Sequence, residues 1–122
     1  MDYNSITEKI IGCAIEVHKN LGPGLLESIY ERALCIELKN SGLNYECQVI
    51  LPVIYKGNEI GNHKIDILVE KSIVLELKST EKMDPVYQAQ TLSYMKLGNF
   101  KLGLLINFNN ILLKDGIKRY IL

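Results

Sequence analysis

The stretch between residues 64 and 78 constrains the fold more than any other part of the chain. Apolar, mostly β-branched residues occupy every second position on both sides of the polar segment 70–72, which is the period of a half-buried β-strand. The stretch therefore predicts a β-hairpin. Asp66, Glu76 and Lys78 interrupt its apolar pattern. Because ionised side chains in such a setting are costly unless they are paired or bind a metal, these charges are the first candidates for a functional site.

The length of the hairpin turn decides whether the three charges meet. Glu76 and Lys78 are two residues apart, so they lie on one face of their strand. A three-residue loop over 70–72 pairs Asp66 with Glu76 and gathers all three charges. A two-residue loop pairs Asp66 with Leu77 and separates them, because a slip of one residue inverts the faces. We predict the three-residue loop, or a bulge with the same parity.

The bulk properties suit a single domain over residues 1–122. A chain of 122 residues with 48% apolar and 23% charged residues has the composition of an ordinary globular protein with one core. No apolar run approaches the ~18 residues of a membrane span, and the N-terminus lacks the blocks of a signal peptide. We therefore expect a cytoplasmic protein with no membrane association. A net charge of zero neither indicates nor excludes a nucleic-acid partner.

Two helices are predicted before the first strand. Ser5 and Glu8 have the spacing of a capping box, which predicts a helix from there to about Asn20. The Gly-Pro-Gly turn at 22–24 ends it and precedes a second helix over about 25–39. Six residues form the apolar stripe of the second helix, which we expect to face the core: Leu26, Ile29, Tyr30, Ala33, Leu34 and Leu38. The cysteines Cys13, Cys35 and Cys47 all fall in apolar patterns, which predicts buried free thiols.

The rest of the chain is rich in strand patterns. Segment 44–53 alternates strictly, so its odd-numbered residues are expected on one face, and a strand from Glu59, kinked at Gly61, leads into the central hairpin. Asp84 and Pro85 predict the start of a third helix that ends near Leu97. Segment 102–106 is nearly all apolar and predicts a central buried strand, followed by a β-rich tail. The order ααβββαβ predicts an α/β (α+β) fold, a mixed sheet flanked by helices.

The charges of the hairpin form a D-x(9)-E-x-K pattern, which is weak alone because a half-exposed hairpin with solvated charges also produces it. Gln90 and Tyr94 add to it, since they share one face of the third helix, which directly follows the hairpin. Glu27 adds a further carboxylate, one turn into a helix that must cover the same sheet. Each of these three also has a simpler interpretation as a surface or core-edge residue.

The segment Gly24-Leu25-Leu26-Glu27-Ser28-Ile29-Tyr30 matches the motif that names the GxxExxY proteins, and segments 17–23 and 103–108 are similar to that family too. Over nearly its whole length the chain resembles this family, which is placed in the PD-(D/E)xK nuclease superfamily. The resemblance implies a restriction-endonuclease-like αβββαβ core, here with one extra N-terminal helix. It also implies a metal-dependent enzyme that hydrolyses the phosphodiester bonds of nucleic acids.

The resemblance implies roles for particular residues. Gln90 with Tyr94 looks like the Q-x-x-x-Y motif of the exonuclease-like branch, and Ile65 stands where a proline often precedes the central Asp66. Tyr94 and His18 are expected to contact substrate, although a histidine at a helix C-terminus is equally explained by the helix dipole. The expected catalytic residues are Glu27, Asp66, Glu76, Lys78 and Gln90.

A divalent cation, Mg²⁺ or Mn²⁺, is the expected cofactor. Mg²⁺ prefers oxygen ligands, and the expected ones are the carboxylates of Asp66, Glu76 and Glu27 and the carbonyl of Leu77. Such a cation would activate a water for attack on the phosphodiester. Lys78 would orient that water or stabilise the negative charge that develops in the reaction.

The expected partner is a nucleic acid, with DNA favoured over RNA. The alternative is a non-catalytic nucleic-acid-binding or oligomeric interaction module that keeps the nuclease fold. The small size favours this alternative, because it leaves little room for a substrate-gripping domain, and a homodimer would then complete the surface. Strand 102–106 or the C-terminal strand would offer an edge for pairing.

Overall fold

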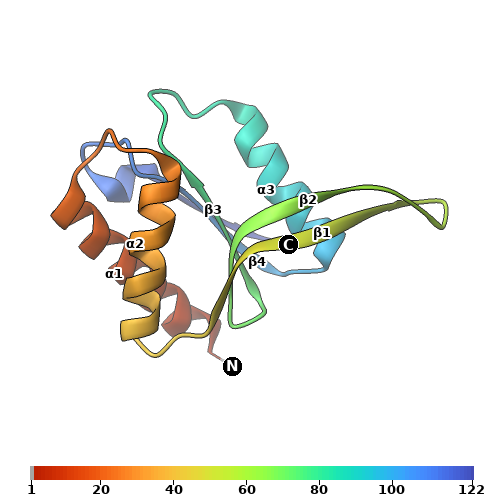
Figure 1. Ribbon diagram of the computed structural model, residues 1–122, viewed down its shortest axis with the longest axis horizontal. Coiled ribbons are helices and arrows are strands. Elements are labelled where there is room, and N and C mark those ends of the chain that lie inside the picture. The colour runs from red at the N-terminus through yellow and green to blue at the C-terminus, as the bar shows by residue number, and fades with distance from the viewer. Residues whose placement is uncertain (1) are drawn as a thin grey trace.

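The computed structural model describes residues 2–122 (Figure 1). The order of helices and strands predicted from the sequence is confirmed, and a short 3₁₀-helix and a fifth strand complete the tail. The elements are α1 (Tyr3–Leu21), α2 (Glu27–Asn40), β1 (Tyr45–Tyr55), β2 (Asn58–Val69), β3 (Ile73–Lys78), α3 (Pro85–Gly98), β4 (Leu102–Asn107), η1 (Leu113–Gly116) and β5 (Ile117–Ile121).

The five strands form one mixed sheet in the order β1-β2-β3-β4-β5. β3 and β4 are parallel, and the other neighbouring pairs are antiparallel. α1 and α2 pack on one face of the sheet and α3 on the other, so the apolar residues form two clusters. All six residues of β4 are buried, which confirms the predicted central strand. β4 therefore offers no free edge, and β1 and β5 are the edge strands.

The helices begin and end through local backbone signals. The expected capping box at Ser5 is wrong, because Asp2 is the N-cap of α1 and its carboxylate accepts from the N–H groups of Asn4 and Ser5. The predicted cap of α3 is confirmed, since the Asp84 carboxylate accepts from the N–H of Val86 at 3.0 Å. Within residues 2–122, no helix combines the length and the apolar character that crossing a bilayer requires.

The turn between β2 and β3 has the predicted three-residue loop. Val69 pairs with Ile73, so residues 70–72 form the loop, and the same register places Asp66 opposite Glu76. Glu70 and Lys71 both adopt left-handed backbone conformations, with φ of 52° and 54°. The Glu70 side chain anchors the turn, because its Oε1 accepts from the N–H of Asn44 at 2.8 Å. The parity that the functional hypothesis required is therefore present.

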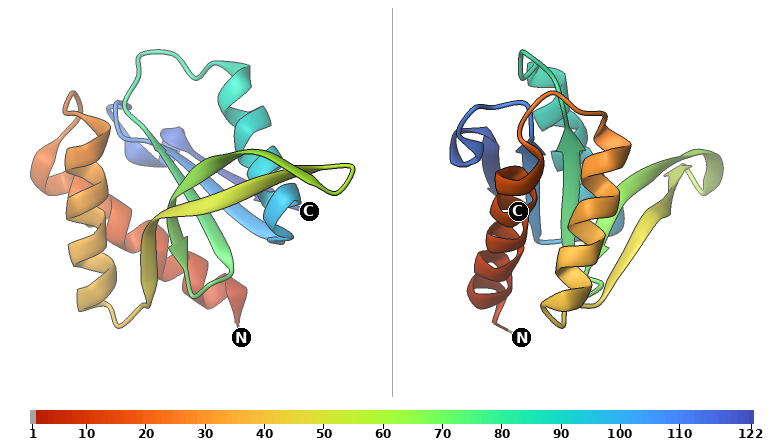
Figure 2. Two further views of the ribbon diagram at one scale, coloured as in Figure 1. Left: turned by 45° about the vertical axis from the view of Figure 1, so that its right-hand side comes forward. Right: turned by 60° about the vertical axis from the view of Figure 1, so that its left-hand side comes forward.

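The expected strict alternation of β1 is wrong, because the β1–β2 hairpin changes faces halfway along. Tyr45 and Ile67 pack toward α1 and α2, whereas Val49 and Ile65 pack toward α3. All four residues are odd-numbered, so strict alternation would put both residues of each strand on one face of the sheet. The change occurs at Gln48, which lies opposite Asp66 and has a φ of 52°. Past the residues that pack on α3, the two strands extend beyond the body of the molecule as an arm (Figures 1 and 2).

Two expectations about burial need correction. Cys13 and Cys35 are buried, but Cys47 is exposed on the edge strand β1. In the apolar stripe of α2, Leu26 is 72% and Ile29 44% exposed, so the first turn of the helix does not contribute to the core. The stripe becomes buried from Tyr30 onward, where α2 reaches the sheet.

Candidate functional site

The site lies where the backbone ladder between β2 and β3 opens. The ladder ends at the pair Ile67 and Leu75, and carboxylates take over the hydrogen bonds at the next position. The N–H of Asp66 donates to Glu76 Oε2, and the N–H of Leu77 donates to Asp66 Oδ2, both at 2.8 Å. Each carboxylate therefore satisfies a backbone N–H where the strands separate. Both acidic side chains are held in place at the mouth of this opening.

A cavity of about 160 Å³, which we call the acidic cavity, adjoins the opening. The amide Nε2 of Gln48 crosses it, donating to Glu31 Oε1 at 2.7 Å and to Asp66 Oδ1 at 3.5 Å. These contacts join α2 to β1 and β2. The lining residues are Glu27, Ser28, Glu31, Gln48, Asp66 and Leu77.

The site carries an excess of negative charge. Burial, followed by the neighbouring charge of Asp66, raises the pKa of the Glu76 carboxyl to about 8, against the opposing effects of the Asp66 N–H and of Lys78. Burial also raises the pKa of Asp66, against the opposing effects of its hydrogen bonds and of Lys78. The pKa of Glu31 is raised by burial and by the charges of Asp66 and Glu27. One lysine does not balance these carboxylates, so an additional cation would stabilise their ionised forms.

Two tyrosines of α3 complete the side of the site opposite α2. Lys78 Nζ lies 4.4 Å from the centre of the Tyr87 ring, a cation–π contact that positions the ammonium. Tyr94 is buried, and the charges of Glu76 and Asp66 help to raise its pKa, after the larger effect of burial. Its hydroxyl lies 3.4 Å from Nδ1 of His63. This contact joins β2 to α3 beside the site.

The remaining expected site residues lie farther out. Gln90 is exposed on α3, one turn from both Tyr87 and Tyr94, and within residues 2–122 its side chain forms no hydrogen bond. His18 Nε2 lies 2.8 Å from the backbone oxygen of Asn110, a contact that ties α1 to the loop after β4. This placement favours the structural interpretation of His18.

The G-x-x-E-x-x-Y segment positions Glu27 through its backbone. Gly24 has a φ of 97°, a conformation that side chains disfavour, and it lets the chain turn into α2, whose first residue is Glu27. Tyr30 stabilises the turn, since its hydroxyl donates to the Gly22 carbonyl and accepts from the Leu25 N–H. Its ring stacks on Phe108 at 4.5 Å. The motif is therefore a support for the acidic residue that it contains.

Sequence reasoning missed Glu31, Gln48 and Tyr87. Glu31 is one turn after Glu27, so the i, i+4 spacing was a usable signal. Tyr87 is two turns before Tyr94 and had the same kind of signal. Gln48 had none, because its position depends on a left-handed backbone in the middle of a strand.

The donor set fits a hard divalent cation in chemistry, although the side chains are not gathered into a coordination shell. Among residues 2–122, no three histidine, cysteine or acidic side chains are arranged to hold a metal ion. Asp66 and Glu76 each spend one carboxylate oxygen on a backbone N–H. The second oxygen of Asp66 has only the 3.5 Å contact with Gln48, so it can still accept a further ligand, as can Oε1 of Glu76. Together with the Leu77 carbonyl these are the oxygen ligands that Mg²⁺ prefers. The uncompensated negative charge supports the same fit.

The family model for the PD-(D/E)XK nuclease superfamily matches residues 4–120. The chain therefore belongs to this superfamily, whose members generally use divalent metals, and its mixed sheet flanked by helices is the restriction-endonuclease-like fold. No curated protein and no solved structure matches the chain significantly.

Proposed function

We propose that the protein is a Mg²⁺- or Mn²⁺-dependent nuclease, with Asp66, Glu76 and Lys78 as the centre of its active site. The observation that carries the proposal is the pairing of Asp66 with Glu76 at the point where β2 and β3 separate. Lys78 is two residues further along the same strand, so its charge lies on the Glu76 side of β3. Membership of the nuclease superfamily supports a nucleic acid as the substrate.

The chain's own residues hold and orient the reacting groups. A divalent cation bound by Asp66, Glu76, the Leu77 carbonyl and Glu27 would supply an activated water and stabilise the phosphoryl charge. Lys78, steadied over the Tyr87 ring, donates hydrogen bonds to the attacking water or to a phosphoryl oxygen. Gln48 holds Glu31 and Asp66 in register across the acidic cavity. Gln90, exposed on α3, binds a substrate phosphate, and the buried Tyr94 lies close enough to Glu76 and Asp66 for their charges to affect it.

We also assign the chain to the GxxExxY group of the superfamily, on the motif at 24–30. DNA is the first substrate to test and RNA the second. Homodimer formation through an edge strand remains part of the proposal for how a small domain grips a long substrate.

Cleavage of labelled single- and double-stranded DNA and RNA, with Mg²⁺ or Mn²⁺ and with a chelator, tests the proposed function. The wild type is expected to cleave at least one substrate in the presence of metal, and Lys78→Ala to lose about 100-fold of the rate. Lys96→Ala is the matched control, because Lys96 is exposed near the other end of α3. Equal rates for all three proteins would show that the activity is not produced by this site.

A binding module without catalysis is the second candidate. The absence of a gathered coordination shell among residues 2–122 favours it. In that case the wild type binds nucleic acid without turnover, and Asp66→Ala binds equally well. Metal-dependent cleavage that is lost in Asp66→Ala excludes this candidate.

A further inference from the structure

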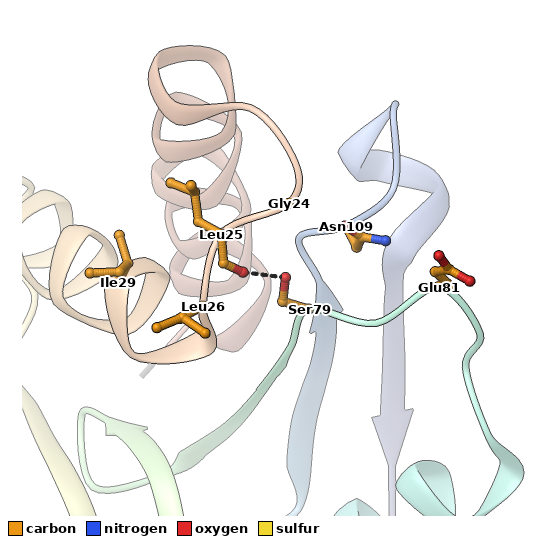
Figure 3. A pocket seen from close by; sticks show the side chains of 7 residues that line it. All are labelled: Gly24, Leu25, Leu26, Ile29, Ser79, Glu81 and Asn109. Carbon is orange, nitrogen blue, oxygen red and sulfur yellow. Dashed lines mark hydrogen bonds between the residues drawn. The ribbon is translucent and has the colours of Figure 1, made fainter.

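A second cavity, which we call the apolar-walled cavity, lies on the other side of the first turn of α2 (Figure 3). It has a volume of about 550 Å³, within the size range of small-molecule binding sites. We propose that it binds the unstacked base of the nucleotide next to the scissile phosphate. This inference rests on the proposed nuclease function. The lining residues are Gly24, Leu25, Leu26, Ile29, Ser79, Glu81 and Asn109.

One wall of the cavity is apolar and open to solvent. It is formed by Leu25, Leu26 and Ile29, which are 39%, 72% and 44% exposed. Exposing three large aliphatic side chains to water at the start of a helix costs free energy. Covering them with an apolar ligand surface would recover part of that cost. The face of a nucleobase is such a surface.

The opposite wall is polar. Figure 3 shows Ser79, Glu81 and Asn109 along the loops that follow β3 and β4, where Ser79 points toward Leu25 and the ends of the Glu81 and Asn109 side chains point away from the leucines. Within residues 2–122 the Asn109 side chain and the Glu81 carboxylate form no hydrogen bond, so their amide and carboxylate remain available to the edge of a base. Asparagine and glutamate are residues that pair with base edges.

The cavity is formed before any ligand binds. Ser79 Oγ donates to the Leu25 carbonyl at 2.6 Å, which joins the two walls at the bottom of the cavity. The buried Asn107 side chain holds Thr80, the residue after Ser79, because it accepts from the Thr80 N–H and donates to the Thr80 carbonyl. Asn107 Oδ1 also accepts from the Asn109 N–H at 3.1 Å. A preformed cavity of this kind loses little entropy on binding.

The position of the cavity beside the acidic cavity indicates which part of the substrate it binds. Leu26 directly precedes Glu27 of the acidic cavity, and Ser79 directly follows Lys78. The parallel strands β3 and β4 both end here, and ligands of open α/β sheets bind outside the carboxyl ends of the strands. A phosphate held at Lys78 therefore places a neighbouring nucleoside at this cavity. A base stacked in a duplex cannot enter it, so the substrate has a single-stranded or frayed end at this point.

A binding experiment on the Asp66→Asn background separates the cavity from the chemistry. The probe is a labelled single-stranded DNA oligonucleotide in Mg²⁺, with a matched set in which one nucleotide at a time is abasic. At one position, removal of the base is expected to weaken binding about tenfold, and Leu26→Ala to weaken binding of the intact strand by a similar factor. The two changes are expected not to add, because both remove the same contact.

Ile36→Ala is the matched control, since Ile36 is 60% exposed on the same helix and does not line the cavity. Equal binding by the Leu26→Ala and Ile36→Ala proteins, or additive losses with the abasic strands, would overturn the cavity proposal and leave the nuclease function standing. A shift of oligomeric state in Leu26→Ala alone, measured by light scattering, would also overturn it, because the occupant would then be a second copy of the chain. Absence of metal-dependent cleavage by the wild type is the separate failure of the proposed function.

A different observation carries a second inference. Cys35 Sγ on α2 and Cys47 Sγ on β1 lie 2.9 Å apart, and Cys47 is exposed to solvent. We infer that the two thiols form a reversible disulfide when a small-molecule disulfide is present. The bond would join α2 to β1 next to Gln48 and one turn after Glu31, so it would fix the width of the acidic cavity.

The exchange proceeds in two balanced steps. The Cys47 thiolate attacks one sulfur of the small disulfide and releases a thiolate. Cys35 then loses its proton, attacks the Cys47 sulfur and releases the second thiolate, so two protein thiols are oxidised and one disulfide is reduced. Burial raises the pKa of Cys35 to about 12, which makes the exposed Cys47 the first nucleophile.

Oxidised glutathione, followed by alkylation and mass spectrometry, tests the pair. The expected product has lost about two mass units and leaves only Cys13 alkylated. The Cys13→Ser protein is expected to lose the same two mass units, whereas the Cys47→Ser protein is expected to form no internal disulfide. A Cys47 that stops at the mixed disulfide, or a protein with three alkylated cysteines, would contradict the inference.

Discussion

The acidic cavity and the apolar-walled cavity lie on two sides of the same helix turn and differ in how they are built. The acidic cavity adjoins buried carboxylates whose charges destabilise the metal-free fold. The apolar-walled cavity is bounded by exposed side chains that contribute little to the core. Both depart from the rule that charges are exposed and apolar groups are buried, in opposite directions. Under the two proposals, catalysis belongs to the acidic cavity and substrate discrimination to the apolar-walled cavity.

The largest expected effect follows from Asp66→Asn. The asparagine oxygen can still accept from the Leu77 N–H, so the fold should remain, but the charge that would bind metal is lost. We expect a loss of at least about 100-fold in cleavage rate, together with loss of the Mg²⁺-dependent rise in Tm. Glu59→Gln, on the exposed arm, should change neither quantity. A comparable loss of rate in Leu26→Ala, measured at saturating substrate, would break the division between the two cavities.

The next effect is a pH-dependent gain of stability in Glu76→Gln. The pKa of Glu76 is about 8 in the folded protein against an ordinary value of 4.5, so the metal-free fold is destabilised as the pH rises through this interval. Glutamine keeps the acceptor for the Asp66 N–H and removes the titration. In chelator at pH 8 we expect a free energy of unfolding higher by roughly 1–3 kcal/mol, shrinking toward zero at pH 5.

Denaturant melts of wild type and Glu76→Gln at the two pH values measure this gain. Saturating Mg²⁺ should reverse its sign, because metal stabilises only the protein with the carboxylate. A gain that is the same at pH 5 and pH 8 would mean that the buried charge is not its cause.

An effect of similar size but opposite sign is expected for Asn107→Ala, which weakens the support of the apolar-walled cavity. The change removes three hydrogen bonds to residues 80 and 109 from a buried position, and we expect a loss of about 1–3 kcal/mol in the free energy of unfolding. Asn109→Ala, whose side chain supports no neighbour within residues 2–122, should stay within ~0.5 kcal/mol of the wild type. Chemical denaturation of both proteins decides between a supporting residue and a surface one.

The smallest effect is expected for Gln48→Gly. The substitution removes the amide that joins Glu31 and Asp66 but relieves the left-handed backbone at φ 52°, which costs a side chain about 1 kcal/mol. The two changes should nearly cancel in the free energy of unfolding. Gln48→Ala keeps the backbone cost and should be less stable than Gln48→Gly by about 1 kcal/mol. Equal Tm values for the two variants would show that the backbone there is not strained.

Much of the fold could be predicted because the strongest signals are local. The period of the hairpin over 64–78 and the Asp84-Pro85 start of α3 depend on neighbours in the chain, and both are confirmed. The prediction was wrong where two local signals competed, as when Asp2 capped α1 in place of Ser5. The alternation of β1 also failed, because a single left-handed residue changes the face of a strand.

The residues of the candidate site could be proposed only in part, since their placement depends on contacts between distant elements. Glu31 meets Gln48 and Asp66 only because α2 packs beside the β1–β2 hairpin. His63 reaches Tyr94 only after the hairpin has changed faces. Neither contact can be predicted from the spacing of residues within one helix or strand.

By itself the sequence narrowed the partner of Asp66 to Glu76 or Leu77 and favoured Glu76, because alternation and a turn length are properties of one short segment; the structure confirms Glu76. Only the tertiary structure decided where the β2–β3 ladder opens, and therefore that both carboxylates replace backbone hydrogen bonds there. It also decided which apolar residues stay outside the core, since burial is set by the elements that pack around a residue. The acidic cavity and the apolar-walled cavity both follow from that packing.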